Sequence, residues 1–423
     1  MSDIVIDSEN ITAVQTPKIP TIVLDKINKI KTQSPKIPLC AYLYDLDGLN
    51  KHTRAIYQKL PQNAEIFYAT KANAEEAILT TIEKNCDGFE VASLGELTKI
   101  RQLFPQKNIV FGGPGKTDAE LEACFDHHVQ YIHVESLFEL QRLAHISQQR
   151  QQTINILFRL NITFDALKHT RLMMGGKATP FGMDEKMLNA CLCFLKNAPF
   201  IQLQGLHLHL VSFQIDEDAH IELIKQYIDY LHQFNKKHYL QLKHLNVGGG
   251  IGVNYQDPTH VFNWSYFFQN LDQILNQSCN QDIVLRFECG RSLTAYCGYY
   301  AAEVLDIKQS HDTYFAVVRG GTHHFRTPYA QSHSHPFSII NIDHWPHTYP
   351  RNTIYHQTCH IVGQLCTPKD ILAYNTPIQK LSHGDIIVFS HAGAYAWNIS
   401  HHDFLCHPHP DHYFLKEDIT YAN

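Results

Sequence analysis

Eight short apolar runs recur along the chain between residues 66 and 291. Each is rich in β-branched and aromatic residues, which is typical of buried strands. The runs are 66–70, 89–93, 109–113, 131–136, 154–161, 203–210, 242–250 and 283–291. Segments with apolar residues at helical spacing separate most of them, for example 93–104, 137–149 and 220–238. Eight β units joined by helices predict an α/β fold with a (β/α)₈ barrel of the TIM type, although strand counting alone leaves a doubly wound open sheet as the alternative.

The pattern changes after about residue 297, where strand-like runs continue with almost no helical periodicity. These later runs are 303–309, 314–320, 354–364, 385–393 and 412–415. They predict a separate C-terminal antiparallel β domain, to which residues 41–44 could add a strand. The expected organisation is a mobile tail over 1–20, a segment of the β domain over 21–48, the barrel over 49–297 and the β domain over 298–423.

Composition narrows the class of partner. The 423 residues are 44% hydrophobic and 18% charged, with a net charge of −6 and no basic run, so a small molecule is a better expected partner than nucleic acid or an anionic membrane. No uninterrupted apolar run of about 18 residues occurs, and the first residues do not resemble a signal peptide. The eleven cysteines form no CxxC pair. We therefore expect a soluble, cytoplasmic protein with reduced thiols.

Candidate chemistry lies where the barrel strands end, because the carboxyl ends of the strands of such a barrel form the active site. Lys71 follows the first run, in YATKAN. A lysine that emerges from an apolar strand can be partly desolvated and become a nucleophilic amine for Schiff-base chemistry. The simpler interpretation is a lysine whose ammonium reaches the solvent at the rim.

Three other strand ends add complementary groups. Gly248, Gly249 and Gly250 end the seventh run, where backbone N–H groups without Cβ atoms nearby can bind a phosphate. Three consecutive glycines are also typical of a flexible turn. Glu288 and Arg291 end the eighth run, where they could hold a pyridinium nitrogen and a phosphate, or simply pair with each other.

His209 lies at the end of the sixth run, and Ser212 follows three residues later. The imidazole could stack on a cofactor ring and the hydroxyl could donate to a phosphate, whereas a barrel histidine can also be purely structural. Amine, anion cradle, carboxylate, guanidinium and flat ring at the strand ends of one barrel together indicate a site for pyridoxal phosphate.

The chain resembles the fold-type III family of pyridoxal-phosphate decarboxylases, which includes ornithine and diaminopimelate decarboxylases. The resemblance covers roughly residues 38–415 and rests on six motifs in order: YATKAN, FEVAS, LNVGGGIGVNY, FECGRS, VGQLCTPKD and SHAGAY. It implies the alanine racemase-like fold, in which a barrel is followed by a β domain. FECGRS departs from the family's EPGR pattern because Cys289 replaces a proline, which should alter the turn more than the chemistry.

The resemblance also implies roles for the matching residues. Lys71 would carry the cofactor as a Schiff base, His209 would stack on its ring and Glu288 would pair with its ring nitrogen. The phosphate would be held by Ser212, Gly248, Gly249, Gly250, Arg291 and Tyr395. Cys366 would reach the active site of a partner subunit and protonate the substrate α-carbon, which makes a homodimer necessary, with Asp370 in the same shared loop. Arg326 matches an arginine that contacts a substrate carboxylate in diaminopimelate decarboxylases.

Thr367 is the departure from the family pattern that bears on the substrate. Ornithine and diaminopimelate decarboxylases have an acid at this position, which balances the distal ammonium of the substrate. Without it we expect a substrate whose distal nitrogen is acylated and neutral. Further stretches, including FGGPGKT, HVES and ISHHDFLCHPHP, resemble siderophore-biosynthesis decarboxylases of the staphyloferrin B type, which act on N-citryl diamino acids. The motifs match best those of the citryl-diaminopropionate enzymes, but they do not fix the length of the diamine, so citryl-diaminobutyrate and citryl-ornithine stay open.

A citryl group would bring extra carboxylates into the site. Arg326 and the pair His323 and His324 are the candidate cations, although the two histidines could also belong to a solvated loop. The other histidine-rich stretches show no recognised ligand spacing, so we expect no metal. Three alternatives stay open: a diaminopimelate decarboxylase, a non-catalytic binding relative and a racemase on the same barrel.

Overall fold

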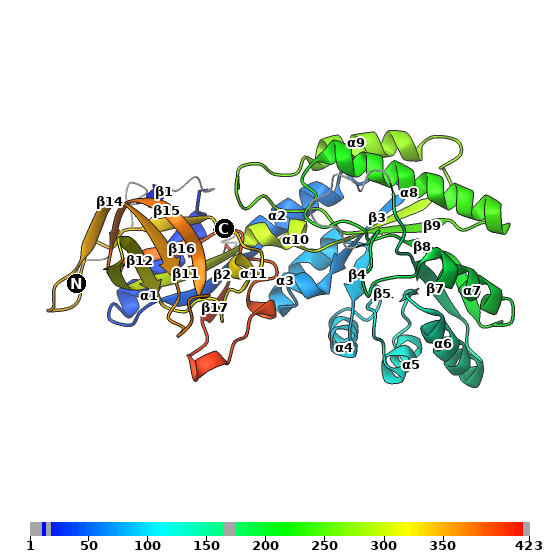
Figure 1. Cartoon of the computed structure of the whole chain (residues 1–423), viewed down its shortest axis with the longest axis horizontal. Helices are drawn as coiled ribbons and strands as arrows, with labels where there is room; N and C mark the ends of the chain where they lie inside the picture. The colour runs from blue at the N-terminus through cyan, green and yellow to red at the C-terminus, as the bar shows by residue number, and fades with distance from the viewer. Residues whose placement is uncertain (1–10, 14–17, 165–174, 418–423) are drawn as a thin grey trace, which may run out of the picture. The chain divides into compact units, whose positions relative to one another are not determined.

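The computed structural model describes residues 11–13, 18–164 and 175–417. They divide into two compact units, which are described separately (Figure 1). The barrel unit holds residues 52–252 and 262–292. The β unit holds the N-terminal part of the chain to Lys51, residues 253–261 and the chain from Leu293 onward.

Eight parallel strands close the barrel unit in the order β10-β3-β4-β5-β6-β7-β8-β9. They are β3 (Ala64–Ala69), β4 (Gly88–Val91), β5 (Asn108–Phe111), β6 (Tyr131–Val134), β7 (Ile154–Arg159), β8 (Ile201–His207), β9 (His244–Gly248) and β10 (Val284–Cys289). All eight lie within the predicted runs or overlap them. Since β10 pairs with both β3 and β9, the sheet has no edge, and the open-sheet alternative is wrong.

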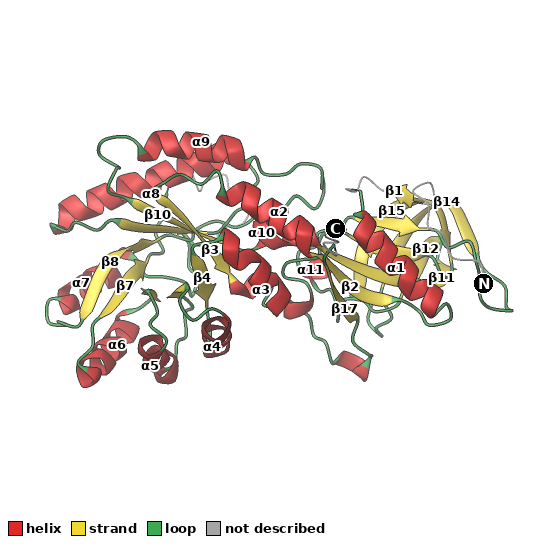
Figure 2. Cartoon of the chain, turned by 180° about the vertical axis from the view of Figure 1, so that it is seen from behind, coloured by secondary structure: helices red, strands yellow, loops and turns green. Residues whose placement is uncertain are grey.

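Helices cover the outside of the barrel (Figure 2). They are α2 (Leu46–Tyr57), α3 (Glu76–Ile82), α4 (Leu94–Leu103), α5 (Asp118–Asp126), α6 (Leu137–Arg150), α7 (Glu185–Leu195), α8 (Glu217–His238) and α9 (Trp264–Leu275), and the short α10 (Arg291–Thr294) follows β10. Local sequence determines where several of them begin. Thr117 forms a capping box with Glu120, and Ser93 and Ser136 accept from the third backbone N–H of their helices.

The β unit is a nine-stranded sheet with the path β1-β13-β16-β11-β12-β14-β15, to which β2 and β17 are added. Its strands are β1 (Ile11–Ala13), β2 (Cys40–Asp45), β11 (Gly298–Ser310), β12 (Thr313–Val318), β13 (Phe337–Ile340), β14 (Thr353–Val362), β15 (Ile371–Ser382), β16 (Ile386–Phe389) and β17 (Asp411–Leu415). The predicted N-terminal strand is confirmed as β2, which pairs antiparallel with β11. Two pairs, β12 with β14 and β17 with β2, are parallel, so the sheet is mainly but not wholly antiparallel.

The core of the β unit explains why the N-terminal segment belongs there. Helix α1 (Thr21–Gln33) buries Val23 and Ile27 against apolar residues of β2, β11 and β16. Residues 1–10 and 14–17 of the expected mobile tail lie outside the described residues, whereas residues 11–13 pair with β13.

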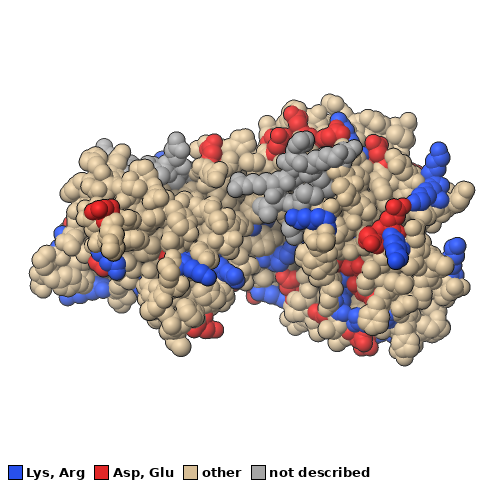
Figure 3. Space-filling view, viewed as in Figure 1, with Lys and Arg blue, Asp and Glu red and all other residues tan. Residues whose placement is uncertain are grey.

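The distribution of charge on the surface and the length and polarity of the helices both bear on possible partners. Basic and acidic side chains are interspersed on the face drawn in Figure 3. Across the described parts of the chain, every helix is too short or too polar to traverse a lipid bilayer.

Candidate active site

The carboxyl ends of neighbouring barrel strands bring the predicted residues together. Lys71 directly follows β3, in a 3₁₀ turn over Thr70–Ala72. Glu288 lies near the end of β10, beside Phe67 of β3, and Gly248 at the end of β9 is in register with Phe287. The amine, the carboxyl group and the glycine run therefore occupy three adjacent strands.

Lys71 forms an ion pair with an acid that sequence reasoning missed. Its Nζ lies 2.6 Å from Oε2 of Glu90, on the neighbouring strand β4. The Lys71 side chain is 48% exposed, whereas that of Glu90 is 5% exposed. The amine is therefore accessible to a ligand, while the buried Glu90 carboxylate fixes its orientation. The signal was present in FEVAS, where an acid interrupts an apolar strand next to the strand that carries the lysine.

Glu288 is a buried acid with little compensation. Its Oε1 accepts from Nδ2 of Asn246 at 2.7 Å, and its carboxylate oxygens lie 3.6 Å from Nε2 of His133 and 3.5 Å from Nε2 of His207. Burial holds the pKa of both histidines well below the usual value, so they bring no charge. Burial, and then the Glu90 carboxylate, raises the pKa of Glu288 to about 7. A positive group beside Glu288 would therefore be stabilised by its carboxylate.

The glycine run can exist only as glycine. Gly248 and Gly250 have φ values of +68° and +78°, which side chains rarely adopt. A Cβ on Gly249 would lie 2.3 Å from the backbone oxygen of Glu288. His209 packs against this run, since its Nδ1 accepts from the Gly249 N–H at 3.2 Å, and burial lowers its pKa to about 3. The result is a bare backbone surface beside a neutral imidazole.

Arg291 and Ser212 are linked through the residue next to the serine. The Arg291 guanidinium lies over the ring of Phe213, 4.4 Å from its centroid. Arg291 begins α10 after β10, while Ser212 and Phe213 follow β8. The barrel unit thus contains the predicted cofactor contacts Lys71, His209, Ser212, Gly248, Gly249, Gly250, Glu288 and Arg291.

These residues fit pyridoxal phosphate. A primary amine suits its aldehyde, the glycine surface and Arg291 suit its phosphate, and Glu288 suits a protonated ring nitrogen. The raised pKa of Glu288 agrees with the last match, because a cation beside the carboxyl group would remove the penalty that burial imposes.

The remaining predicted residues lie in the β unit. Cys366 is a free, exposed thiol in the loop between β14 and β15. Thr367, next to it, is half-buried, and its N–H donates to the backbone oxygen of Leu365. Tyr395 has a φ of +49°, and its backbone oxygen accepts from the hydroxyl of Thr327.

Asp370 holds the Cys366 loop together. Its carboxylate accepts from the N–H and hydroxyl of Thr322 at 2.6 and 2.8 Å and from the N–H of Leu365 at 2.8 Å. The residue is only 2% exposed. Its carboxylate is occupied by the chain itself, so the structure supports a positioning role. Contact with substrate remains a prediction.

His323 and His324 do not meet the expectation that they supply positive charge. Both are fully buried, and their rings lie 3.9 Å apart. Burial lowers the pKa of His323 to about 4 and that of His324 to about 2, so both are neutral. Because both side chains are buried, the alternative that they belong to a solvated loop is wrong too. Arg326 is exposed, as a substrate-binding cation can be.

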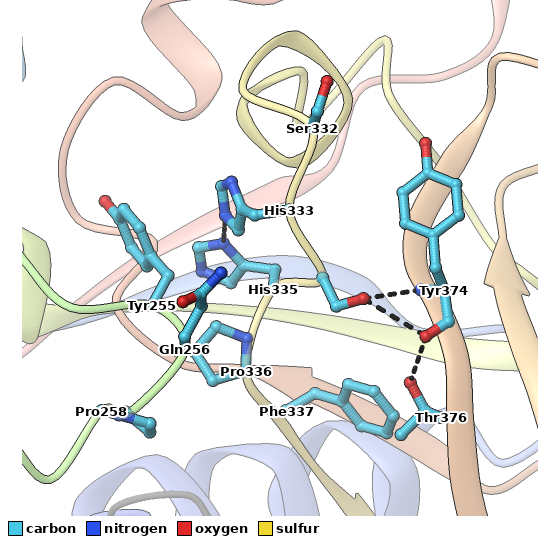
Figure 4. Close-up of a pocket in the computed structure, with 11 residues that line it drawn as sticks. Tyr255, Gln256, Pro258, Ser332, His333, His335, Pro336, Phe337, Tyr374 and Thr376 are labelled. Atoms are coloured by element: carbon cyan, nitrogen blue, oxygen red, sulfur yellow. Dashed lines mark hydrogen bonds between the residues drawn. The ribbon is translucent and has the colours of Figure 1, made fainter. Parts of the chain in front are cut away.

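A cavity of about 630 Å³ in the β unit is lined by Tyr255, Gln256, Pro258, residues 332–337, Tyr374 and Thr376 (Figure 4). His333 and His335 lie in its wall with Nε2 and Nδ1 3.1 Å apart, and the second ring also bonds to the backbone oxygen of Ser390. Both rings pack on Tyr255, with centroids 4.8 and 4.9 Å away. These histidines therefore build the wall of the cavity.

Comparisons with known proteins agree with this geometry. A family model described as the pyridoxal-binding domain of pyridoxal-dependent decarboxylases matches residues 46–295. The 2-[(L-alanin-3-ylcarbamoyl)methyl]-2-hydroxybutanedioate decarboxylase of Staphylococcus aureus is 44% identical over 383 residues, which cover 90% of this chain and 96% of that protein.

Diaminopimelate decarboxylases are less similar. The enzyme of Bacteroides thetaiotaomicron is 28% identical over 84% of this chain and 90% of its own length. The crystal structure of the Helicobacter pylori enzyme in complex with L-lysine superposes with a TM-score of 0.78 at 26% identity, over 92% of this chain and 94% of that one. The likeness therefore extends through both units of the chain.

Proposed function

Because the chain belongs to the family of pyridoxal-dependent decarboxylases, we propose that it removes the α-carboxylate of an N-citryl diamino acid in siderophore biosynthesis. The observation that carries this proposal is the 44% identity to the Staphylococcus aureus enzyme over nearly the full length of both proteins. Citryl-diaminopropionate is the first candidate, and citryl-diaminobutyrate and citryl-ornithine are close analogues.

The chemistry of such a substrate suits the loop at Cys366. The name of the Staphylococcus aureus enzyme describes an alanine unit joined through an amide to a hydroxybutanedioate. An amide nitrogen is neutral and needs no counter-charge, and Thr367 offers none. A free distal ammonium, as in diaminopimelate, would have to be buried beside Thr367 without an acid in that position, which is costly.

The barrel residues hold the reacting group. Pyridoxal phosphate, when bound, supplies the electron-accepting ring that makes loss of carbon dioxide possible. Lys71 would hold it covalently, and Glu288 would keep its ring nitrogen protonated. Gly248–Gly250, Arg291, Ser212 and Tyr395 would bind its phosphate, and His209 would lie against its ring. Glu90 would orient Lys71 and accept a hydrogen bond from its amine.

Cys366 would donate a proton to the substrate α-carbon in the site of a partner subunit. Its free, exposed thiol supports this role. We accordingly propose a homodimer with shared active sites. A cytoplasmic location stays a prediction.

The test is carbon dioxide release by the purified enzyme supplied with pyridoxal phosphate. We expect turnover of the citryl diamino acids and little with free diaminopropionate, ornithine or diaminopimelate. Lys71→Ala should lose both turnover and the cofactor adduct that borohydride reduces onto the wild-type protein. Faster turnover of diaminopimelate would favour a lysine-pathway enzyme, and no carbon dioxide from any substrate would favour a binding relative.

A further inference from the structure

Arg319 is a half-buried cation whose guanidinium binds a side-chain amide. It follows β12, and its Nη1 donates to Oε1 of Gln364 at 2.7 Å. Among the described residues, no carboxylate pairs with it. Three other arginines with little exposure each pair with an acid: Arg159 with Glu135, Arg286 with Glu65 and Arg351 with Asp385. Arg319 is therefore available to bind an anion.

Gln364 attaches this guanidinium to the loop that carries Cys366. The Gln364 Oε1 also accepts from the Gly320 N–H at 2.8 Å, and its own N–H donates to the Gly320 oxygen at 2.9 Å. Its Nε2 lies 3.0 Å from Nδ1 of His407. Since Gln364 is two residues before Cys366, Arg319 is fixed at the base of the loop proposed to reach the substrate.

Within the described part of the chain, the groups around Arg319 do not balance its positive charge. Asp370, the acid of this loop, is committed to Thr322 and Leu365. His323 and His324 are neutral, as described above. Arg326, in the turn after Gly320 and Gly321, adds a second cation that is exposed. A ligand bound here should therefore be an anion, and a guanidinium suits a carboxylate because it can donate two parallel hydrogen bonds.

We propose that Arg319 binds a carboxylate of the acyl part of the substrate and thereby selects tricarboxylate-derived amides over other acylated diamino acids. This inference rests on the proposed function. It assigns the recognition of the citryl group to the base of the Cys366 loop, with Gln364 as the residue that positions the guanidinium.

The test compares two substrates in matched variants. Arg319→Gln should lower kcat/KM for citryl-diaminopropionate about 10- to 100-fold, mainly through KM, because a charge-assisted hydrogen bond is lost. With N-acetyl-diaminopropionate, which lacks the citryl carboxylates, kcat/KM should stay within about twofold of wild type. Arg54→Gln, the same change at an exposed position on α2, should alter neither value. Equal losses with both substrates, or no loss with the citryl substrate, would overturn the proposal.

Two further measurements distinguish the loss of anion binding from a folding defect and from a failure of the proposed function. Gln364→Glu keeps the side-chain shape but places a carboxylate against Arg319, so it should weaken citryl selectivity as Arg319→Gln does. Calorimetric titration of the holoenzyme with citrate should show binding that weakens at least about tenfold in both variants. If wild type releases no carbon dioxide but shows this binding, the anion site stands and the proposed function fails. If wild type turns over the citryl substrate and neither variant differs from it, the function stands and this inference fails.

Discussion

Asn246 joins Glu288 to the glycine run. Its Nδ2 donates to Glu288 Oε1 at 2.7 Å, and its Oδ1 accepts from the Gly248 N–H at 2.9 Å. The residue is 1% exposed and lies on β9, between β8, which ends in His207, and β10, which carries Glu288. One amide thus sets the distance between the acid proposed for the ring nitrogen and the backbone proposed for the phosphate.

Replacing Asn246 with Ala should weaken cofactor binding about 10- to 100-fold, because a hydrogen bond to a charged group and a contact with the glycine run are both lost. The measurement is the dissociation constant of pyridoxal phosphate, followed by its absorbance. Asn270→Ala, which removes a surface hydrogen bond on α9, is the control. An unchanged dissociation constant would show that Asn246 does not support the cofactor.

Glu288 should make the stability of the cofactor-free protein depend on pH. Its pKa is raised by burial, and then by Glu90, from 4.5 to about 7. Between these values the folded state holds the proton and the unfolded state does not, so the stability that this group contributes falls as the pH rises. Glu288→Gln should therefore raise Tm relative to wild type by more at pH 8 than at pH 5.

Thermal unfolding of both apoproteins at the two pH values provides the measurement. Saturating pyridoxal phosphate should reverse the order at pH 8, because Glu288 then has a cationic partner and Gln does not. An equal Tm difference at both pH values would mean that Glu288 ionises normally.

Shared active sites predict complementation between inactive subunits. Lys71→Ala and Cys366→Ala homodimers should each be nearly inactive. Co-expressed, they should recover about a quarter of wild-type activity, because half of the dimers are mixed and each mixed dimer has one intact site. Steady-state carbon dioxide release from the affinity-purified mixture measures this. No recovery would place Cys366 outside the partner's site.

Asp370→Ala should destabilise the protein by about 3 kcal/mol, because it leaves three donors around the Cys366 loop unpaired. It should also lower kcat and leave the cofactor absorbance nearly unchanged. The Cys366 loop belongs to the β unit, whereas most of the predicted cofactor contacts belong to the barrel unit. Chemical denaturation and single-turnover kinetics test the two effects. Asp282→Ala, which removes a surface ion pair with Lys243, should cost less than about 1 kcal/mol. A rise in KM alone would favour direct substrate contact by Asp370.

The sequence predicted the barrel well because its signals are local. Each strand run is mostly apolar, and polar groups such as Lys71 and Glu288 stand at or near the ends of the runs. The predictions for the β unit were weaker. Strands β1, β13 and β15 were missed, and His323 and His324 were interpreted as accessible cations although both are buried.

The amino-acid sequence by itself determined the order of the barrel strands and most of their helices, the candidate lysine and glycine run at the strand ends, and the family resemblance, because these depend on side-chain pattern and spacing. Only the tertiary structure decided which groups meet: Lys71 with Glu90, Asn246 with Glu288, and Arg319 with Gln364. Burial and neighbouring charge control whether such groups are ionised. Burial and neighbouring charge depend on residues far apart in the chain, so a local sequence pattern does not predict them.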